Sequence, residues 1–107
     1  MATTSKRLEF FLSAVSAESS DPMTYYGLAM EYRALGRFDE ALAAFESLRA
    51  RWPEYVPAYL MCGMMLVEMG RAAEARSWFV AGIDVARAGR NAHAVGELES
   101  ALAAAEE

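Results

Sequence analysis

Cys62 and His93 are the single cysteine and the single histidine of this chain, so they are the first residues to test for chemistry. A cysteine nucleophile needs a base within hydrogen-bond reach and a setting that stabilises its thiolate. Cys62 instead falls on the apolar side of a helical pattern, where cysteine packs as a small hydrophobic residue. We therefore predict a core thiol at Cys62.

His93 has a carboxylate one helical turn away, at Glu97. Such a pair binds zinc only when further ligands complete a set of three or four, and no suitable partners accompany it. Phosphate-binding loops are not indicated either, because the glycines outside the turns stand singly inside helical patterns. We expect a surface pair at His93, no catalytic residue, no metal site and no cofactor, and we predict that the protein is not an enzyme.

The charge of the chain argues against nucleic acid and membrane as partners. The net charge is −5, and residues 54–107 carry four Lys or Arg against eight Asp or Glu. A phosphate backbone requires a basic surface, which is not indicated here. No segment reaches the 18 or more apolar residues of a membrane span. Glu9 interrupts the short apolar run after Lys6 and Arg7, unlike a signal peptide. With one cysteine and no disulfide framework, we expect a cytoplasmic protein.

Helices are the elements that the sequence predicts. Alanine is abundant while Val, Ile and Thr are scarce, which favours an all-α fold. Apolar residues spaced at i, i+3, i+4 and i+7 predict helices at about 22–35, 38–51, 57–69 and 72–88. Asp21 is a suitable N-cap before Pro22, and Gly36 and Gly70 are suitable left-handed stops.

A short phrase recurs along these helices: GRFDEA at 36–41, GRAAEA at 70–75 and GRNAHA at 89–94. Pairing residues 22–55 with 56–89 aligns the first two copies 34 residues apart and gives seven identities. A fixed period of this length indicates stacked helix pairs. The third copy comes early, and we expect the preceding helix to end at Gly89 with one final helix beginning at once.

The repeated positions resemble the tetratricopeptide repeat, a 34-residue helix–turn–helix family. The resemblance is carried by a first-helix aromatic residue, a turn glycine, a second-helix Ala and Phe, and a closing proline: Tyr25, Gly36, Ala41, Phe45 and Pro53, then Tyr59, Gly70, Ala75 and Phe79. It implies a right-handed α-α superhelix of helix hairpins with about six helices. We expect one domain over residues 1–107, with a flanking helix at 4–17, repeats at 22–55 and 56–89, and a capping helix at 90–106.

The two flanking segments should protect the apolar ends of the stack. Upstream, Leu8, Phe11, Leu12 and Val15 share one helical stripe that is expected to face the first repeat. Trp78 is expected to pack on the final helix or to take part in a dimer contact.

The resemblance also implies a binding surface, because the first helices of such repeats line a concave groove that holds segments of partner proteins. The matching positions here are Met23, Tyr26, Met30 and Arg33, then Leu60, Met61, Met64 and Glu68. The Lys and Asn residues with which some members clamp a C-terminal carboxylate are missing from these positions.

We therefore predict a non-enzymatic interaction module whose apolar, methionine-rich groove binds a protein or peptide partner, or a second copy of the chain in a homo-oligomer. Two other interpretations stay open. In one interpretation, the chain's own terminal helix fills the groove. In the other, the protein shields a hydrophobic partner, as secretion chaperones built on this repeat do.

Overall fold

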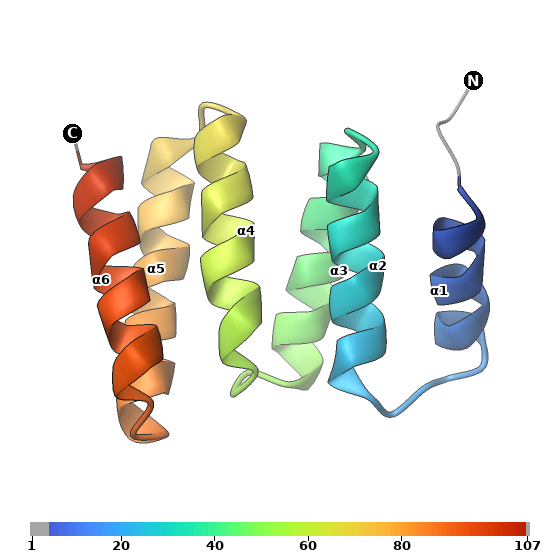
Figure 1. Ribbon diagram of the computed structural model, residues 1–107, viewed down its shortest axis with the longest axis horizontal. Coiled ribbons are helices and arrows are strands. Elements are labelled where there is room, and N and C mark those ends of the chain that lie inside the picture. The colour runs from blue at the N-terminus through green and yellow to red at the C-terminus, as the bar shows by residue number, and fades with distance from the viewer. Residues whose placement is uncertain (1–4, 107) are drawn as a thin grey trace. The chain divides into compact units, whose positions relative to one another are not determined.

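The computed structural model describes residues 5–106, and within this range it contains six α-helices and no β-strand (Figure 1). The helices are α1 (Lys6–Ser16), α2 (Pro22–Ala34), α3 (Phe38–Arg51), α4 (Val56–Glu68), α5 (Ala72–Ala88) and α6 (Ala92–Ala105). The all-α prediction is confirmed, and the four predicted repeat helices end within one residue of α2 to α5. Residues 1–4 and 107 of the predicted domain, and hence the start of the predicted 4–17 helix, lie outside the described residues.

The helices form two compact units, Met1–Trp52 and Pro53–Glu107, which are described one at a time. In the first unit α2 packs on both α1 and α3. In the second unit α4, α5 and α6 all contact one another. Figure 1 shows α2 beside α3, and α5 beside α6, as neighbouring rods within their units. A single domain over residues 1–107 stays a prediction.

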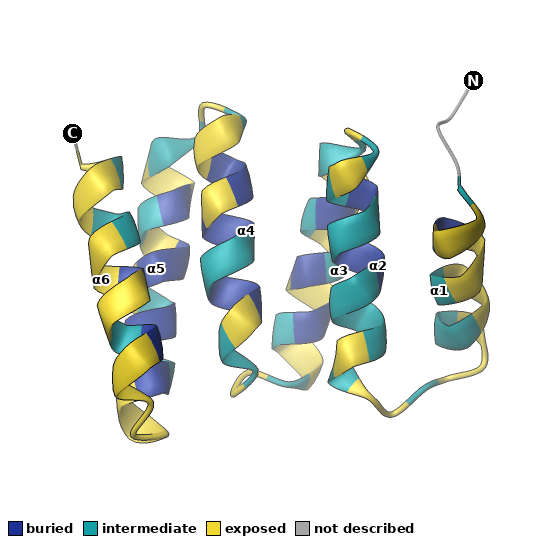
Figure 2. Ribbon diagram, in the orientation of Figure 1, coloured by how far each residue is buried: buried dark blue, intermediate teal, exposed yellow. Residues whose placement is uncertain are grey.

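Large apolar side chains fill the core of each unit, and the buried residues lie on the helix sides that face a neighbour (Figure 2). In the first unit α1 contributes Leu8, and α3 contributes Phe45 and Leu48, all almost completely buried. Leu12 departs from the predicted α1 stripe, because 39% of it is exposed.

In the second unit α4 contributes Tyr59 and Leu66, α5 contributes Phe79, and α6 contributes Leu98 to the core. Trp78 differs from the sequence prediction. Its ring lies 5.8 Å from the ring of Tyr59 on α4, centre to centre. Phe79 packs against Gly63, one turn further along the same helix. The rings of Trp78 and Phe79 therefore both contact α4, because they pack at Tyr59 and at Gly63, which lie one helical turn apart.

The hairpin turns at Gly36 and Gly70 have the same conformation. Both glycines have a φ of 76°, in the left-handed region that glycine enters without steric cost. The amide of the next residue donates to a carbonyl of the preceding helix, from Arg37 to Tyr32 and from Arg71 to Leu66. These two predicted stops are confirmed.

The third copy of the phrase folds differently from the first two. Gly89 follows α5 with a φ of −86°, and Arg90 takes the left-handed place with a φ of 55°. Asn91, rather than an arginine, then begins the next helix, and its side chain accepts a hydrogen bond from the amide of Ala94 at 3.1 Å. α5 ends at Ala88 with Gly89 as its C-cap, as the sequence predicted, but the left-handed residue of this copy comes one residue after the glycine.

Candidate protein-binding faces of α2 and α4

The first candidate face lies on α2 and consists of Met23, Tyr26, Met30 and Arg33. These positions are three or four residues apart, so they share one side of the helix. Met23 is 64% exposed, while the other three are half-buried. Tyr26 also reaches inward, since its ring lies 6.4 Å from that of Phe45 on α3. The opposite side of α2 carries the buried Leu28 and Tyr32. The face is thus apolar, with one arginine at its C-terminal end.

The second candidate face lies on α4 and consists of Leu60, Met61, Met64 and Glu68. Leu60 and Met61 are half-buried, Met64 is 42% exposed and Glu68 is exposed. Other sides of the same helix are buried through Ala58, Tyr59, Cys62, Met65 and Leu66. α4 therefore has two apolar sides, of which one fills the core and the other is open to solvent.

Val67 belongs to the α4 face, although the sequence prediction did not include it. It is 44% exposed and lies three residues after Met64 and seven after Leu60, so it shares their side of the helix. The sequence already held this signal, because the 34-residue repeat pairs Val67 with Arg33 of the α2 face. With Val67, the α4 face has four apolar residues and ends at Glu68.

Tight packing inside each hairpin holds these faces in position. Ala41 and Ala75 are completely buried in the second helices. A Cβ atom added at Gly63 would overlap the ring of Phe79, so glycine is what allows α5 to lie close to α4. These signature positions serve the scaffold and lie away from the exposed faces.

The signature aromatic residues also have structural partners. The Arg51 guanidinium lies over the rings of Tyr25 and Trp52 and donates a hydrogen bond to the Tyr25 hydroxyl at 2.8 Å. In the second unit, the buried Tyr59 donates its hydroxyl to the carbonyl of Pro53. Each pair ties the start of a first helix to the chain segment at the end of a second helix, which fixes the ends of the binding faces.

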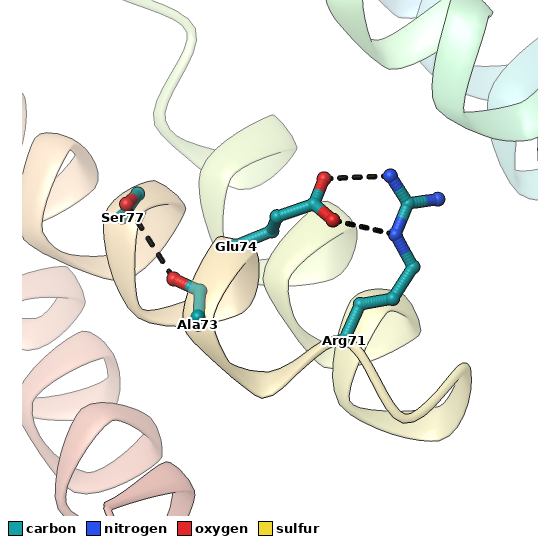
Figure 3. A network of polar contacts seen from close by, with 4 residues as sticks. All are labelled: Arg71, Ala73, Glu74 and Ser77. Atoms are coloured by element: carbon teal, nitrogen blue, oxygen red, sulfur yellow. Dashed lines mark hydrogen bonds and ion pairs between the residues drawn. The ribbon is translucent and has the colours of Figure 1, made fainter.

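Paired charges follow each glycine turn. Arg71 donates two hydrogen bonds to the Glu74 carboxylate, at 2.7 and 2.6 Å, while the nearby Ser77 hydroxyl lies 3.5 Å from the Ala73 carbonyl (Figure 3). Arg37 holds Glu40 in the same way, at 2.6 Å for both bonds. These hydrogen bonds lower the pKa of the Glu40 and Glu74 carboxyls. The two pairs are fixed, exposed features of the scaffold.

Cys62 and His93, the residues considered first for chemistry, lie in different surroundings. Cys62 is completely buried in the core of the second unit, as predicted. His93 forms a surface pair with Glu97 at 3.3 Å, and its side chain is 87% exposed. Within residues 5–106, no three His, Cys, Asp or Glu side chains cluster closely enough to hold a metal ion.

The paired helices and left-handed glycine turns define a helical-repeat protein, and comparisons with known proteins give its family. A family model of the tetratricopeptide repeat matches residues 26–84. The solution structure of a tetratricopeptide repeat domain protein from Salinibacter ruber is 34% identical, with a TM-score of 0.78, over 81% of this chain and 88% of that one. The chain therefore belongs to the tetratricopeptide repeat family.

Two further structures agree with this assignment. A crystal structure of a tetratricopeptide repeat domain protein from Salinibacter ruber is 35% identical, with a TM-score of 0.75, over 80% of this chain and 97% of that one. The solution structure of a Bordetella parapertussis protein has a TM-score of 0.81 over 96% of this chain and 90% of that one. At 21% identity, the latter shows the fold alone.

Membership of this family supports a protein–protein interaction module, because tetratricopeptide repeats are in general a non-enzymatic interaction fold. In the part of the chain that the structure describes, no helix has the length and apolar character needed to cross a membrane. The single concave groove predicted across both repeats stays a prediction, and the α2 and α4 faces are treated separately.

Proposed function

We propose that this protein is a non-enzymatic binding module that holds an amphipathic helix or peptide of a partner protein against the apolar faces of α2 and α4. The observation that carries the proposal is the exposure of large methionines on both faces. Met23 is 64% and Met64 is 42% exposed, on helices whose other sides are already packed in a core.

Exposed apolar side chains gathered on one side of a helix indicate a surface that another chain covers. Four of the seven methionines of the chain lie on these two faces. Methionine is unbranched and polarisable, so it adapts to side chains of differing shape. Spacings of three, four and seven residues on each face match the way in which an amphipathic helix is held through its apolar side.

Each face ends at a charged residue. Arg33 closes the α2 face with a positive charge, and Glu68 closes the α4 face with a negative charge. The bulk of the contact on either face is apolar.

A second candidate function uses the same faces. A chaperone-like protein would cover a long hydrophobic stretch of a client, and the predominance of methionine over polar residues favours this role too. In a third arrangement, a second copy of the chain covers the α2 and α4 faces. The three differ in what binds: a short amphipathic peptide, an extended hydrophobic segment, or the chain itself.

Selection from a displayed library of random peptides tests the proposal without a known partner. We expect the wild-type chain to enrich peptides with apolar residues at helical spacing. In the variant Met30→Glu, Met61→Glu and Met64→Glu, three carboxylates enter the two faces, and burying them against a peptide is costly. Enrichment should therefore be lost.

A matched control carries the same three added charges elsewhere. Ala43→Glu, Ala73→Glu and Ser77→Glu lie at exposed positions of α3 and α5. This variant should select the same peptides as the wild type, and both variants should keep the helical circular dichroism of the parent. Equal enrichment by the face variant and the wild type would refute the proposal. Enrichment of long, uniformly apolar peptides in place of amphipathic ones would favour the chaperone-like function.

A further inference from the structure

Phe10 is the most exposed large apolar side chain among residues 5–106, at 67%. It lies on an exposed side of α1, about 160° around the helix axis from the buried Leu8. Its ring packs in a T-shaped arrangement with the ring of Phe11, with 5.4 Å between the ring centroids, and this contact helps to fix the orientation of Phe10. An outer helix of a repeat protein normally presents a polar outer surface. Phe10 breaks that rule.

Two basic residues accompany Phe10. Lys6 and Arg7 precede it by four and three residues, so both lie next to it on the helix surface. Both are exposed, with 82% of the Arg7 side chain open to solvent even though Arg7 lies 3.6 Å from the Glu31 carboxylate. Glu9 is turned about 100° away from Phe10 around the helix axis. This exposed side of α1 therefore carries one aromatic ring, that of Phe10, beside the positive charges of Lys6 and Arg7. We call this ring the Phe10 knob.

A cleft of about 410 Å³ lies between α5 and α6 in the second unit. Its apolar lining comes from Val80, Ile83 and Leu102, and its acidic lining from Asp84, Glu99 and Glu106. Val80 is 48% exposed, so the apolar part is open to a visiting side chain. Arg87 is engaged by Glu99 at 3.2 Å, which leaves the surroundings of the cleft acidic on balance.

We propose that the α5–α6 cleft binds the Phe10 knob of a second copy of this chain. The knob supplies one aromatic ring with positive charge beside it, and the cleft supplies an apolar lining with negative charge around it. Both the apolar surfaces and the charges are complementary. The contact uses neither the α2 face nor the α4 face, so both candidate binding faces stay available.

The contact joins two different surfaces, so a pair of copies joined by one contact still carries one unused knob and one unused cleft. These either bind each other, which closes a two-fold dimer, or bind further copies, and the average mass distinguishes the two products. One ring and its neighbours bury less than the roughly 1,200 Å² of a standard interface, so we expect weak association, with a dissociation constant of about 0.1–1 mM.

Sedimentation velocity over a range of concentrations tests this arrangement. We expect the wild-type chain to show a rising average mass as its concentration approaches the millimolar range. Phe10→Ser and Val80→Glu should each raise the dissociation constant at least tenfold. Leu12→Ser and Val67→Glu are the controls, because both alter exposed apolar residues outside the proposed contact. Circular dichroism of each variant checks that it is folded.

A mixing experiment separates this contact from one in which the same surface patch of two copies meets itself. The Phe10→Ser variant keeps an intact cleft, and the Val80→Glu variant keeps an intact knob. Their equimolar mixture should form one-to-one dimers and nothing larger, although each variant alone is monomeric. The proposal is overturned if the wild type stays monomeric throughout, if the mixture fails to associate, or if Val67→Glu abolishes association while Phe10→Ser leaves it intact.

Discussion

Arg90 adopts a left-handed backbone conformation at the place where the two other turns use glycine. A side chain with a Cβ atom is strained there, by roughly 1–2 kcal/mol relative to the ordinary helical region. We expect Arg90→Gly to raise the free energy of unfolding by about 1 kcal/mol, as measured by urea denaturation. Gly89→Ala is the control, because its φ is negative and its added Cβ would meet only ordinary contacts. A less stable Arg90→Gly protein would contradict this account of the turn.

Glu40 and Glu74 make the stability of the protein sensitive to acid. Hydrogen bonds from Arg37 and Arg71 lower the pKa of both carboxyls below the ordinary value of 4.5. Groups of this kind stabilise the folded state above their unfolded pKa, and their contribution is lost as the pH falls through the lowered folded value.

The double variant Glu40→Gln and Glu74→Gln should therefore lose less stability than the wild type when the pH is lowered from neutrality to below 4.5. Thermal unfolding followed by circular dichroism at several pH values measures this. Parallel pH profiles for the two proteins would show that the pairs contribute nothing to folding.

At the level of the elements, the hairpin of α4 and α5 depends on the close approach of Phe79 to Gly63. A Cβ at Gly63 would overlap a ring that is itself fully buried and has no room to move. Overpacking of this kind costs about 1–3 kcal/mol. Gly96 is the matched control within α6, where an added Cβ meets nothing within 4 Å.

We expect Gly96→Ala to stabilise the protein by about 0.5–1 kcal/mol, because alanine is the better helix former. Gly63→Ala gains the same helix propensity, but its added Cβ overlaps the Phe79 ring. Its free energy of unfolding should therefore be about 1–3 kcal/mol lower than that of Gly96→Ala. Chemical denaturation of the two single variants measures the difference. Equal stabilities would mean that the α4–α5 hairpin is loosely packed.

The helices could be predicted from the sequence because their signals are local. The side chain of Asp21 accepts the hydrogen bond from Met23 that an N-cap should, and Gly36 takes the left-handed conformation that its position suggested. At the third copy of the motif α5 ends at Ala88, just before Gly89, as predicted, but Arg90 rather than the glycine takes the left-handed conformation. The repeated motif does not by itself decide which residue of the turn takes that conformation.

The candidate faces stay a prediction. Met23 and Met64 are exposed, as a binding surface requires. Val67 was left out of the predicted α4 face, although the 34-residue repeat pairs it with Arg33. Phe11 rather than Phe10 was placed on the inward stripe of α1, and the structure has Phe11 half-buried and Phe10 67% exposed. How far each side chain is exposed depends on the neighbouring helix, which periodicity alone does not identify.

At the scale of the whole molecule, the tetratricopeptide hairpins bury one side of each first helix and leave an apolar side of α2 and α4 in solvent. We propose that its two methionine-rich faces are the surfaces that other proteins bind. The charged pairs, the glycine turns and the aromatic anchors all serve to hold those faces.

Amide chemical-shift mapping with a selected amphipathic peptide tests this central claim most directly. We predict that titration of the peptide into isotopically labelled protein shifts the amides around Met23 and Met30 in α2 and around Met61 and Met64 in α4. The exposed sides of α3 and α5 should be unaffected. Shifts confined to α3, α5 or α6, or no saturable shift on α2 and α4, would contradict the account.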